Sequence, residues 1–241
     1  MRQRTLLALV GGVVFIGVAI ATLPASLLVS HLPPDITLDG VGGSVWSGDA
    51  DLVHVRGVAL GAASWSIEPL ALLSGRLQYH VDLTRSDGSL HGRIAATAGA
   101  LLGEDLALDL PIGVLSGDAW QGEMKGTIRS VRLEHGWPVS LTGAFTFSNV
   151  LPPGAGVAIG SYAVEFDPAA NADGRLVGRV RDVDSSLQVR AQLLIQRDRS
   201  YTLDGDVTPR PNAPPQVTQA IAFLGAPDAS GRRPFMIGGT F

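Results

Sequence analysis

The segment LQVRAQLLIQ, residues 187–196, alternates apolar and polar side chains along its length. Side chains in a β-strand point alternately to the two faces of a sheet, so this period of two predicts a half-buried strand. An Arg197-Asp-Arg-Ser turn follows, and a further alternating segment begins at Tyr201. Two such segments joined by a short turn predict an antiparallel hairpin. The apolar faces of this hairpin are Leu187, Val189, Ala191, Leu193 and Ile195 on one strand and Tyr201, Leu203, Gly205 and Val207 on the other.

Similar alternation recurs along the chain on both sides of this hairpin. It predicts strands within residues 51–56, 63–68, 76–85, 90–97, 141–148, 162–167 and 233–241. A less regular stretch, 99–118, predicts a short strand followed by one helical turn, and the apolar spacing in 216–224 predicts a helix. Because the strands are short, closely spaced and joined by hairpins, we expect an all-β fold with antiparallel strands. The expected form is a multi-stranded curved sheet, a sandwich or a partly open barrel.

The N-terminal run TLLALVGGVVFIGVAIATL, residues 5–23, contains no charged residue. As a helix it would be about 28 Å long, close to the ~30 Å hydrocarbon thickness of a bilayer. Arg2 and Arg4 precede the run, and no further lysine or arginine follows before Arg56. The positive-inside bias therefore predicts a single transmembrane helix with a cytoplasmic N-terminus.

This anchor sets the predicted organisation of the chain. The alternative is a cleaved signal peptide ending near Ala21, but the apolar core of such a peptide is usually about 7–15 residues long, and this run is longer. We therefore expect an uncleaved anchor that precedes the β fold. The predicted parts are a cytoplasmic tail at 1–4, a transmembrane anchor at 5–23, a connector at 24–35 and a periplasmic β domain at 36–241.

The composition narrows the classes of protein that fit. The chain has 241 residues and a formal net charge of −4, and its pI is about 5.7, which argues against nucleic-acid binding. Cysteine is absent, so no disulfide can stabilise the domain. Residues 45–50 weakly resemble 119–124, and this repeat suggests two fused sheet units with a break near 99–121.

No pattern typical of catalysis or cofactor binding is present. The five histidines lack the spacing of metal ligands. The glycine-rich stretch 154–160 has the wrong spacing for a phosphate-binding loop and leads into a strand rather than a helix. Two pairs of acidic residues, Asp182 with Asp184 and Asp204 with Asp206, could bind Ca²⁺ weakly, but solvated strand ends explain them better. We therefore expect a protein that is not an enzyme and that binds no metal ion or cofactor.

Several stretches of the sequence carry a resemblance to a known family. They are GVGGSVWSGDA at 40–50, the segment at 60–77, and the C-terminal stretches 208–210 and 223–231. They resemble the N component of the bacterial type II secretion system, the GspN family. The matching motif residues, for which the resemblance implies a structural role, are Gly43, Val45, Trp46, Ser47, Gly48, Trp65, Pro69, Pro209, Arg210, Gly225 and Gly231. We expect Trp46 and Trp65 to be buried and to support the sheet.

The resemblance implies an inner-membrane protein with a periplasmic domain, belonging to the machinery that exports folded proteins across the outer membrane. Its implied partners are the lipid bilayer and other subunits of the secretion system. These subunits would be those of the inner-membrane platform or the outer-membrane secretin. Nucleic acid is not expected as a partner.

Two physical interpretations of the β domain remain open. In the first, an exposed sheet edge contacts other subunits. Candidate edges are residues 41–46 and the terminal strand with Phe235, Met236 and Ile237. In the second, the apolar face of the sheet forms an open groove for a lipid or another apolar ligand. Burial in the core is the simpler expectation for that face, because a domain without cysteine depends on its core for stability.

Overall fold

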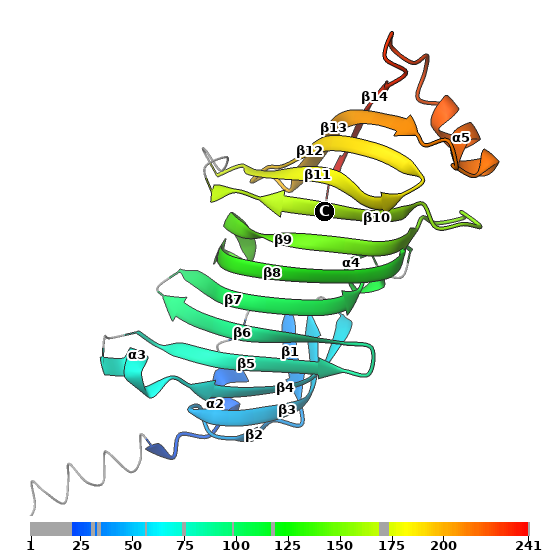
Figure 1. Ribbon diagram of the computed structural model, residues 1–241. Helices are drawn as coiled ribbons and strands as arrows, with labels where there is room; N and C mark the ends of the chain where they lie inside the picture. Colours follow the sequence, from blue (N-terminus) through cyan, green and yellow to red (C-terminus); the bar gives the residue numbers. More distant parts are fainter. Residues whose placement is uncertain are drawn as a thin grey trace, which may run out of the picture. The chain divides into compact units, whose positions relative to one another are not determined.

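Figure 1 shows the computed structural model of the protein, which describes residues 21–29, 32, 35–55, 57–73, 76–97, 99–116, 119–168 and 174–240. The chain divides into two compact units, Met1–Ser86 and Asp87–Phe241. The membrane helix predicted at 5–23 lies outside the described residues, except for 21–23. Within the ranges given above, no helix has the length and hydrophobicity needed to cross a membrane.

The first unit is an antiparallel sheet with two short helices. In sheet order its strands are β1 (Ile36–Asp39), β3 (Ser47–Val55), β4 (Val58–Ile67) and β5 (Gln78–Arg85), and β2 (Gly42–Gly43) pairs with β3. The helices are α2 (Ser26–Val29) and α3 (Pro69–Leu73). Its buried apolar side chains are few and mostly small, namely Ala25, Ala50, Val53 and Leu83.

The second unit consists mainly of strands that each pair with the next strand in sequence. They are β6 (Gly88–Thr97), β7 (Ala100–Pro111), β8 (Gln121–Glu134), β9 (Trp137–Leu151), β10 (Gly160–Phe166), β11 (Leu176–Ser185), β12 (Leu187–Ile195), β13 (Ser200–Pro209) and β14 (Arg233–Thr240). All of these pairs are antiparallel. A helical turn, α4 (Gly113–Ser116), follows β7, and α5 (Pro215–Ala222) lies between β13 and β14. The strands of this unit form one open, curved sheet (Figure 1).

Three groups of buried side chains form the core of the second unit. The first group is Leu108, Leu110, Ile112, Met124 and Val150, the second is Leu141, Val164, Phe166 and Leu176, and the third is Leu187, Val207, Val217 and Ile221. Phe145 and Phe166 pack edge to face with their ring centroids 6.0 Å apart, a favoured arrangement for aromatic pairs. The third group joins β12 and β13 to α5, because Val217 and Ile221 lie one turn apart on the same side of that helix.

The prediction of an antiparallel all-β fold is confirmed in both units. Of the forms considered, the second unit adopts the open curved sheet. The expected hairpin is present as β12 and β13, with Val189 opposite Val207 and Leu193 opposite Leu203. The helix expected at 216–224 is α5, and the expected closing strand is β14.

Some strands differ from the expectation because local irregularities hide their alternation. The strand expected to be short within 99–118 is β7, which extends from Ala100 to Pro111 and contains Asp105 with a φ of +49°. The sequence pattern did not indicate β11. Opposite the step from Ser161 to Tyr162, β11 contains one additional residue, Val183, and such a bulge interrupts the period of two. The boundary between the two units, at Ser86 and Asp87, lies before the break near 99–121 that the repeat suggested.

Candidate functional site

Residues 42–48, Gly-Gly-Ser-Val-Trp-Ser-Gly, form a tight turn between β2 and β3, which we call the signature turn. Gly43 pairs with Gly48 and has a φ of +80°, a left-handed conformation that favours glycine. The Ser44 backbone N–H donates to the Ser47 carbonyl oxygen at 2.8 Å. The Ser47 N–H donates in turn to Ser44 Oγ at 3.2 Å. These bonds fix the conformation of the turn.

The two tryptophans of the family motif support the signature turn. The indole N–H of Trp65 donates to the Ser44 carbonyl oxygen at 3.3 Å. Its ring lies so close to Gly48 that a Cβ atom added there would approach Trp65 Cζ2 to 2.6 Å. The Trp46 carbonyl oxygen accepts a hydrogen bond from the Ile67 N–H at 2.6 Å.

The expectation that both tryptophans are fully buried is wrong. Trp46 and Trp65 are half-buried. The physical reason is the small core of the first unit, because its buried apolar side chains are few and mostly small and cannot enclose two indole rings.

The segment that follows the predicted anchor is joined to the signature turn. The Val45 N–H donates to the Leu23 carbonyl oxygen at 2.9 Å, and the Ala25 N–H donates to the Gly43 carbonyl oxygen at 3.2 Å. Pro24 forms an isolated antiparallel bridge with Ser44. Ala25 is only 1% exposed. The signature turn therefore fixes residues 23–25 to the sheet of the first unit.

The prolines and the arginine of the motif stand at the ends of secondary-structure elements. Pro69 is the first residue of α3, a position at which the missing N–H leaves no helical hydrogen bond unmade. Pro209 is the last residue of β13 and pairs with Leu187. The next residue, Arg210, donates its backbone N–H to the Ser186 carbonyl oxygen at 2.9 Å. Arg210 thereby holds the end of β13 against the start of β12.

Arg210 also forms an ion pair with Asp182 on β11. The Val189 N–H donates to Asp182 Oδ1 at 2.9 Å. Partial burial opposes ionisation of this carboxyl group, but the hydrogen bonds from Val189 and Arg210 outweigh it and hold the pKa of Asp182 below its ordinary value. Asp182 therefore joins three neighbouring segments of the second unit.

The acidic pairs are not part of a metal site in the part of the chain that the structure describes. No group of three or more histidine, aspartate or glutamate side chains there is arranged to hold a metal ion. Asp182 has a structural partner instead, and Asp204 is exposed on β13.

The closing motif forms the turn that leads from α5 to β14. Gly225 and Gly231 both have a left-handed φ, +103° and +80°. Between them, Asp228 Oδ1 accepts hydrogen bonds from the backbone N–H groups of Ser230 at 2.8 Å and Arg232 at 2.9 Å. The hydrogen bond from the Ser230 hydroxyl and those from the two N–H groups lower the pKa of Asp228. This network sets the point at which β14 begins.

Strand β14 is the last strand of the sheet of the second unit. It pairs with β13 from Arg233 opposite Val207 to Thr240 opposite Ser200, and no other strand among the described residues pairs with it. Met236 is 72% exposed, whereas Phe235 is half-buried and packs against the third core group. Of the three residues proposed for partner contact, Met236 is therefore the one that faces solvent most fully.

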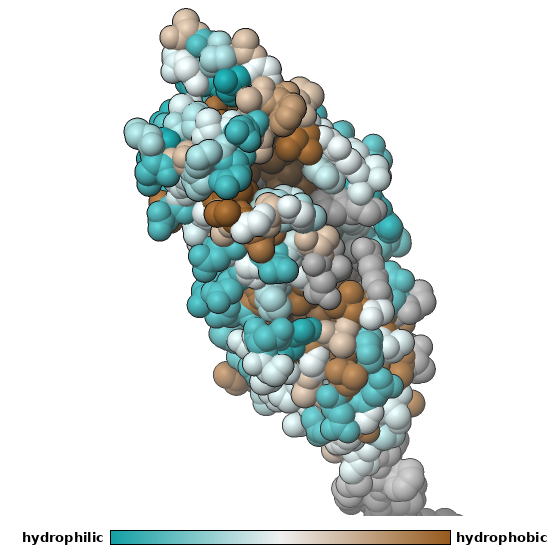
Figure 2. All heavy atoms as spheres, turned by 90° about the vertical axis from the view of Figure 1, so that its right-hand side faces the viewer, coloured by the Kyte–Doolittle hydropathy of each residue, from teal (hydrophilic) through white to brown (hydrophobic). Residues whose placement is uncertain are grey.

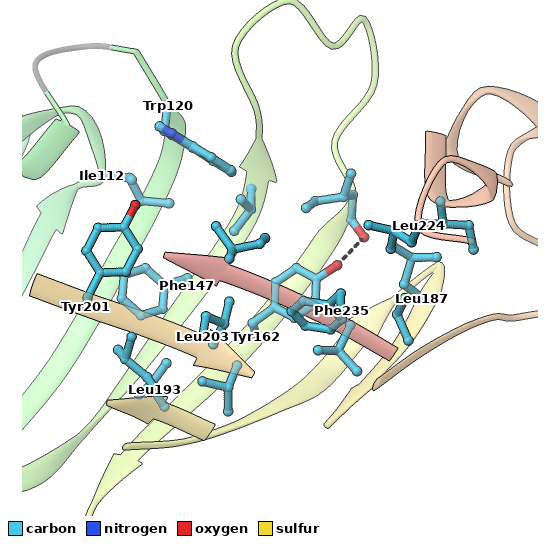
Figure 3. Close-up of a pocket in the computed structure, with 18 residues that line it drawn as sticks. Ile112, Trp120, Phe147, Tyr162, Leu187, Leu193, Tyr201, Leu203, Leu224 and Phe235 are labelled. Atoms are coloured by element: carbon cyan, nitrogen blue, oxygen red, sulfur yellow. Dashed lines mark hydrogen bonds between the residues drawn. The ribbon is translucent and has the colours of Figure 1, made fainter. Parts of the chain in front are cut away.

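An apolar pocket with a volume of about 500 Å³ lies within the second unit (Figure 3). Side chains from β9 to β14, from α5 and from the segments that follow β7, β9 and α5 line it. The space-filling view shows hydrophobic residues gathered in a hollow in its upper part, at the height of β12, β13 and α5 in Figure 1. The lining includes much of the apolar face predicted for the hairpin, namely Leu187, Val189, Leu193, Tyr201, Leu203 and Val207.

The expectation that this face is simply buried in the core therefore holds only in part. Leu187 and Val207 are buried, but Val189, Leu193 and Leu203 are half-buried at the pocket wall. The sheet curves without closing on a second layer, so some of its apolar side chains face a cavity instead of other side chains.

The hydroxyl groups of Tyr162 and Ser185, near the pocket, form hydrogen bonds within the protein. The Tyr162 hydroxyl donates to the Ile159 carbonyl oxygen at 3.1 Å, the hydrogen bond drawn as a dashed line in Figure 3. It also lies 2.9 Å from Ser185 Oγ. Ser185 Oγ in turn donates to Ile159 O at 2.8 Å and accepts the Leu187 N–H at 3.0 Å. Burial raises the pKa of Tyr162, and the Ser185 hydrogen bond only partly opposes this. The other lining residues are apolar except for Tyr201 and Trp120, which contribute a hydroxyl and an indole N–H group, and none of the lining residues is charged.

Comparison with known proteins gives a consistent result. The family model described as type II secretion system (T2SS), protein N, matches residues 34–236. The chain is 28% identical over 250 aligned residues to the type II secretion system protein N of Aeromonas hydrophila, with 97% of each chain covered. It is 25% identical to the protein of the same name from Vibrio cholerae, covering 88% of this chain and 89% of the relative.

The similarity to Klebsiella pneumoniae type II secretion system protein N is 23% identity over 98% of this chain and 95% of the relative. No solved structure matches this chain significantly. The family model covers most of the sequence, including the signature turn, the Pro209-Arg210 corner and the closing motif. The chain belongs to the type II secretion system protein N family.

Proposed function

We propose that this protein is a non-enzymatic component of the type II secretion system, anchored in the inner membrane by residues 5–23. Its β domain extends into the periplasm and acts in the export of folded proteins by binding other subunits of the system. Those subunits belong to the inner-membrane platform or the outer-membrane secretin. Family membership supports the assignment to the secretion system.

The observation that supports the mode of binding is the free edge of β14. A strand with one unpaired edge presents backbone N–H and C=O groups that can pair with a strand of another chain. The described sheet leaves β14 in this position, and Met236 adds an exposed apolar side chain to it. The turn around Asp228 fixes the start of the strand, so the edge is preorganised for a partner strand.

The signature turn supports the role of the segment that follows the anchor. Its hydrogen bonds to Leu23 and Ala25 join residues 23–25 to the first unit. A helix at 5–23 would thus be followed directly by residues that are hydrogen-bonded to the first unit. This is the arrangement expected for a tether that holds a periplasmic domain close to the membrane.

Strand addition at β14 predicts that Met236→Lys lowers secretion. A lysine on an edge strand opposes pairing with another strand, because pairing would remove water from its charged ammonium group. Val183→Lys is the matched control, since Val183 is 53% exposed but is the bulge residue of β11, an inner strand with neighbours β10 and β12. The measurement is the amount of exported protein in the medium and in the periplasm, at equal cellular abundance of each variant.

The expected result is retention of exported protein in the periplasm with Met236→Lys and normal secretion with Val183→Lys. Met236→Ala separates the charge from the loss of the methionine, and it should secrete better than Met236→Lys. Normal secretion by an abundant Met236→Lys protein would show that the β14 edge is not the contact surface.

A further inference from the structure

The apolar pocket of the second unit has a lining that suits a hydrocarbon and little else. Its walls carry aliphatic and aromatic side chains and no charged side chain. The Tyr162 hydroxyl and Ser185 Oγ bond to the protein itself. A peptide placed there would bring N–H and C=O groups into a site without partners for them, which is costly. A sugar or a nucleotide would meet the same obstacle.

The dimensions of the pocket suit one chain of methylene groups. A cavity of about 500 Å³ falls within the range of small-molecule sites, about 300–1,000 Å³. A single acyl chain is a ligand in the size class that sites of this volume hold. The pocket is also extended, because Figure 3 shows Ile112, Trp120 and Tyr201 at one end and Leu187 and Leu224 at the other.

The rim of the pocket is open and apolar. Trp120, Leu224 and Ile237 all line the pocket and are also exposed to solvent. They come from three separate parts of the unit, the segment before β8, the segment after α5 and strand β14. A ligand with an apolar chain inside could therefore leave its polar end in water at the rim, where no cation within the pocket is needed to bind it.

We propose that this pocket binds one acyl chain of a glycerophospholipid, with the headgroup outside. The lipid as a source of the chain rests on the proposed membrane anchoring, which keeps the domain next to a bilayer. The pocket itself, with its lining and its size, is observed whether or not the proposed anchoring and secretion function are correct. Strand β14 contributes Phe235 and Ile237 to the wall and so has a second role besides the proposed partner contact.

The test is photo-crosslinking in native membranes with the full chain. A photoreactive amino acid replaces Leu203, whose side chain lines the pocket, or, as the matched control, Asp204, the exposed next residue of β13 that points to the other face. After irradiation the protein is purified under denaturing conditions and its intact mass is measured. Mild alkaline hydrolysis of an aliquot then cleaves the ester bonds of any attached lipid.

The expected result is a mass increase of one glycerophospholipid at position 203 and none at position 204. Alkaline hydrolysis should leave one fatty acyl chain on the protein, because the crosslink joins the chain and not the headgroup. A peptide adduct, an adduct of a free fatty acid or of a lipoprotein alone, equal adducts at both positions, or no adduct at position 203 would each overturn the proposal.

A second experiment fills the pocket with a larger side chain and measures whether the lipid adduct is lost. Val189→Trp adds a large apolar side chain to the pocket wall, and Gln188→Trp places the same side chain on the exposed opposite face of β12. Val189→Trp should abolish the lipid adduct at position 203, and Gln188→Trp should preserve it, in proteins of equal thermal stability. An undiminished adduct in the Val189→Trp protein contradicts a chain bound in the pocket, whereas secretion in the Met236 variants tests the proposed function separately.

Discussion

At the residue scale, Trp65 connects the signature turn to β4 by a ring contact with Gly48 and a hydrogen bond to Ser44. We expect Trp65→Ala to lower the free energy of unfolding by about 2 kcal/mol, less than the about 3–5 kcal/mol typical of a fully buried tryptophan, because Trp65 is half-buried. Urea unfolding followed by circular dichroism measures the change. Trp65→Phe keeps an aromatic ring against Gly48 and should recover most of the loss. An unchanged midpoint for Trp65→Ala would mean that the ring does not support the turn.

The carboxylate of Asp182 links three segments of the second unit. Its contribution to stability depends on pH. Its folded-state pKa lies below the unfolded value of about 3.9. The ionised carboxylate therefore stabilises the fold above that value, and its contribution is lost as the pH falls through the folded-state pKa. Asp182→Asn should cost about 1–2 kcal/mol at pH 7, since a hydrogen bond to a charged group is strong but Arg210 is exposed to solvent.

The same comparison at acidic pH tests this assignment. Urea unfolding at pH 7 and near pH 3 should show a smaller difference between wild type and Asp182→Asn at the lower pH. Asp204→Asn removes an exposed carboxylate from β13 and should have little effect at either pH. If Asp182→Asn lowered the free energy of unfolding equally at both pH values, the charge of Asp182 would not be what stabilises its contacts with Val189 and Arg210.

At the scale of elements, α5 is a short helix whose stability depends on what it packs against. It comprises Pro215–Ala222 and has no side-chain N-cap, and a helix of this length is marginal in isolation. Val217 and Ile221 bury it against β12 and β13. Ile221→Ala should therefore cost about 2–5 kcal/mol and accelerate hydrogen exchange of the α5 amides. Mass spectrometry of peptides covering the helix measures this exchange.

The control for α5 is Gln219→Ala on its exposed side. Alanine has a slightly higher helix propensity than glutamine, so the expected change is within about 0.5 kcal/mol. Similar exchange in the Ile221→Ala and Gln219→Ala proteins would mean that packing on the third core group does not hold the helix in place.

At the scale of the whole molecule, the proposed division of labour assigns the partner contacts to the β domain and tethering to residues 5–23. That segment contains no charged side chain, whereas helices that transfer protons or substrates usually carry one. Replacement of 5–23 by an unrelated spanning helix of equal length should therefore preserve secretion. The measurement is export at equal protein abundance. Loss of export by a folded and abundant chimaera would make the membrane helix itself a binding surface.

The sequence alone determined the antiparallel strands and much of their pairing. The alternation in 187–196 and from Tyr201 onward is a local property, because successive side chains of a strand always point to opposite faces. It therefore predicted the hairpin of β12 and β13 and the faces on which Leu193 and Leu203 lie. The same reasoning could not identify β11, since the bulge at Val183 breaks the period.

The tertiary structure decided what each face meets. The alternation of Val189 and Leu203 is the same whether a second layer covers them or a cavity does, so the pocket was not determined by the pattern. The bonds of Asp182 to Val189 and Arg210 join residues distant in sequence, and no local rule pairs them. Trp46 and Trp65 are half-buried for a similar reason, because burial depends on how large a core the whole unit assembles around them. Period and turn chemistry are local and can be obtained from the sequence, whereas burial and cavities depend on how far the sheet curves and on which strand is last.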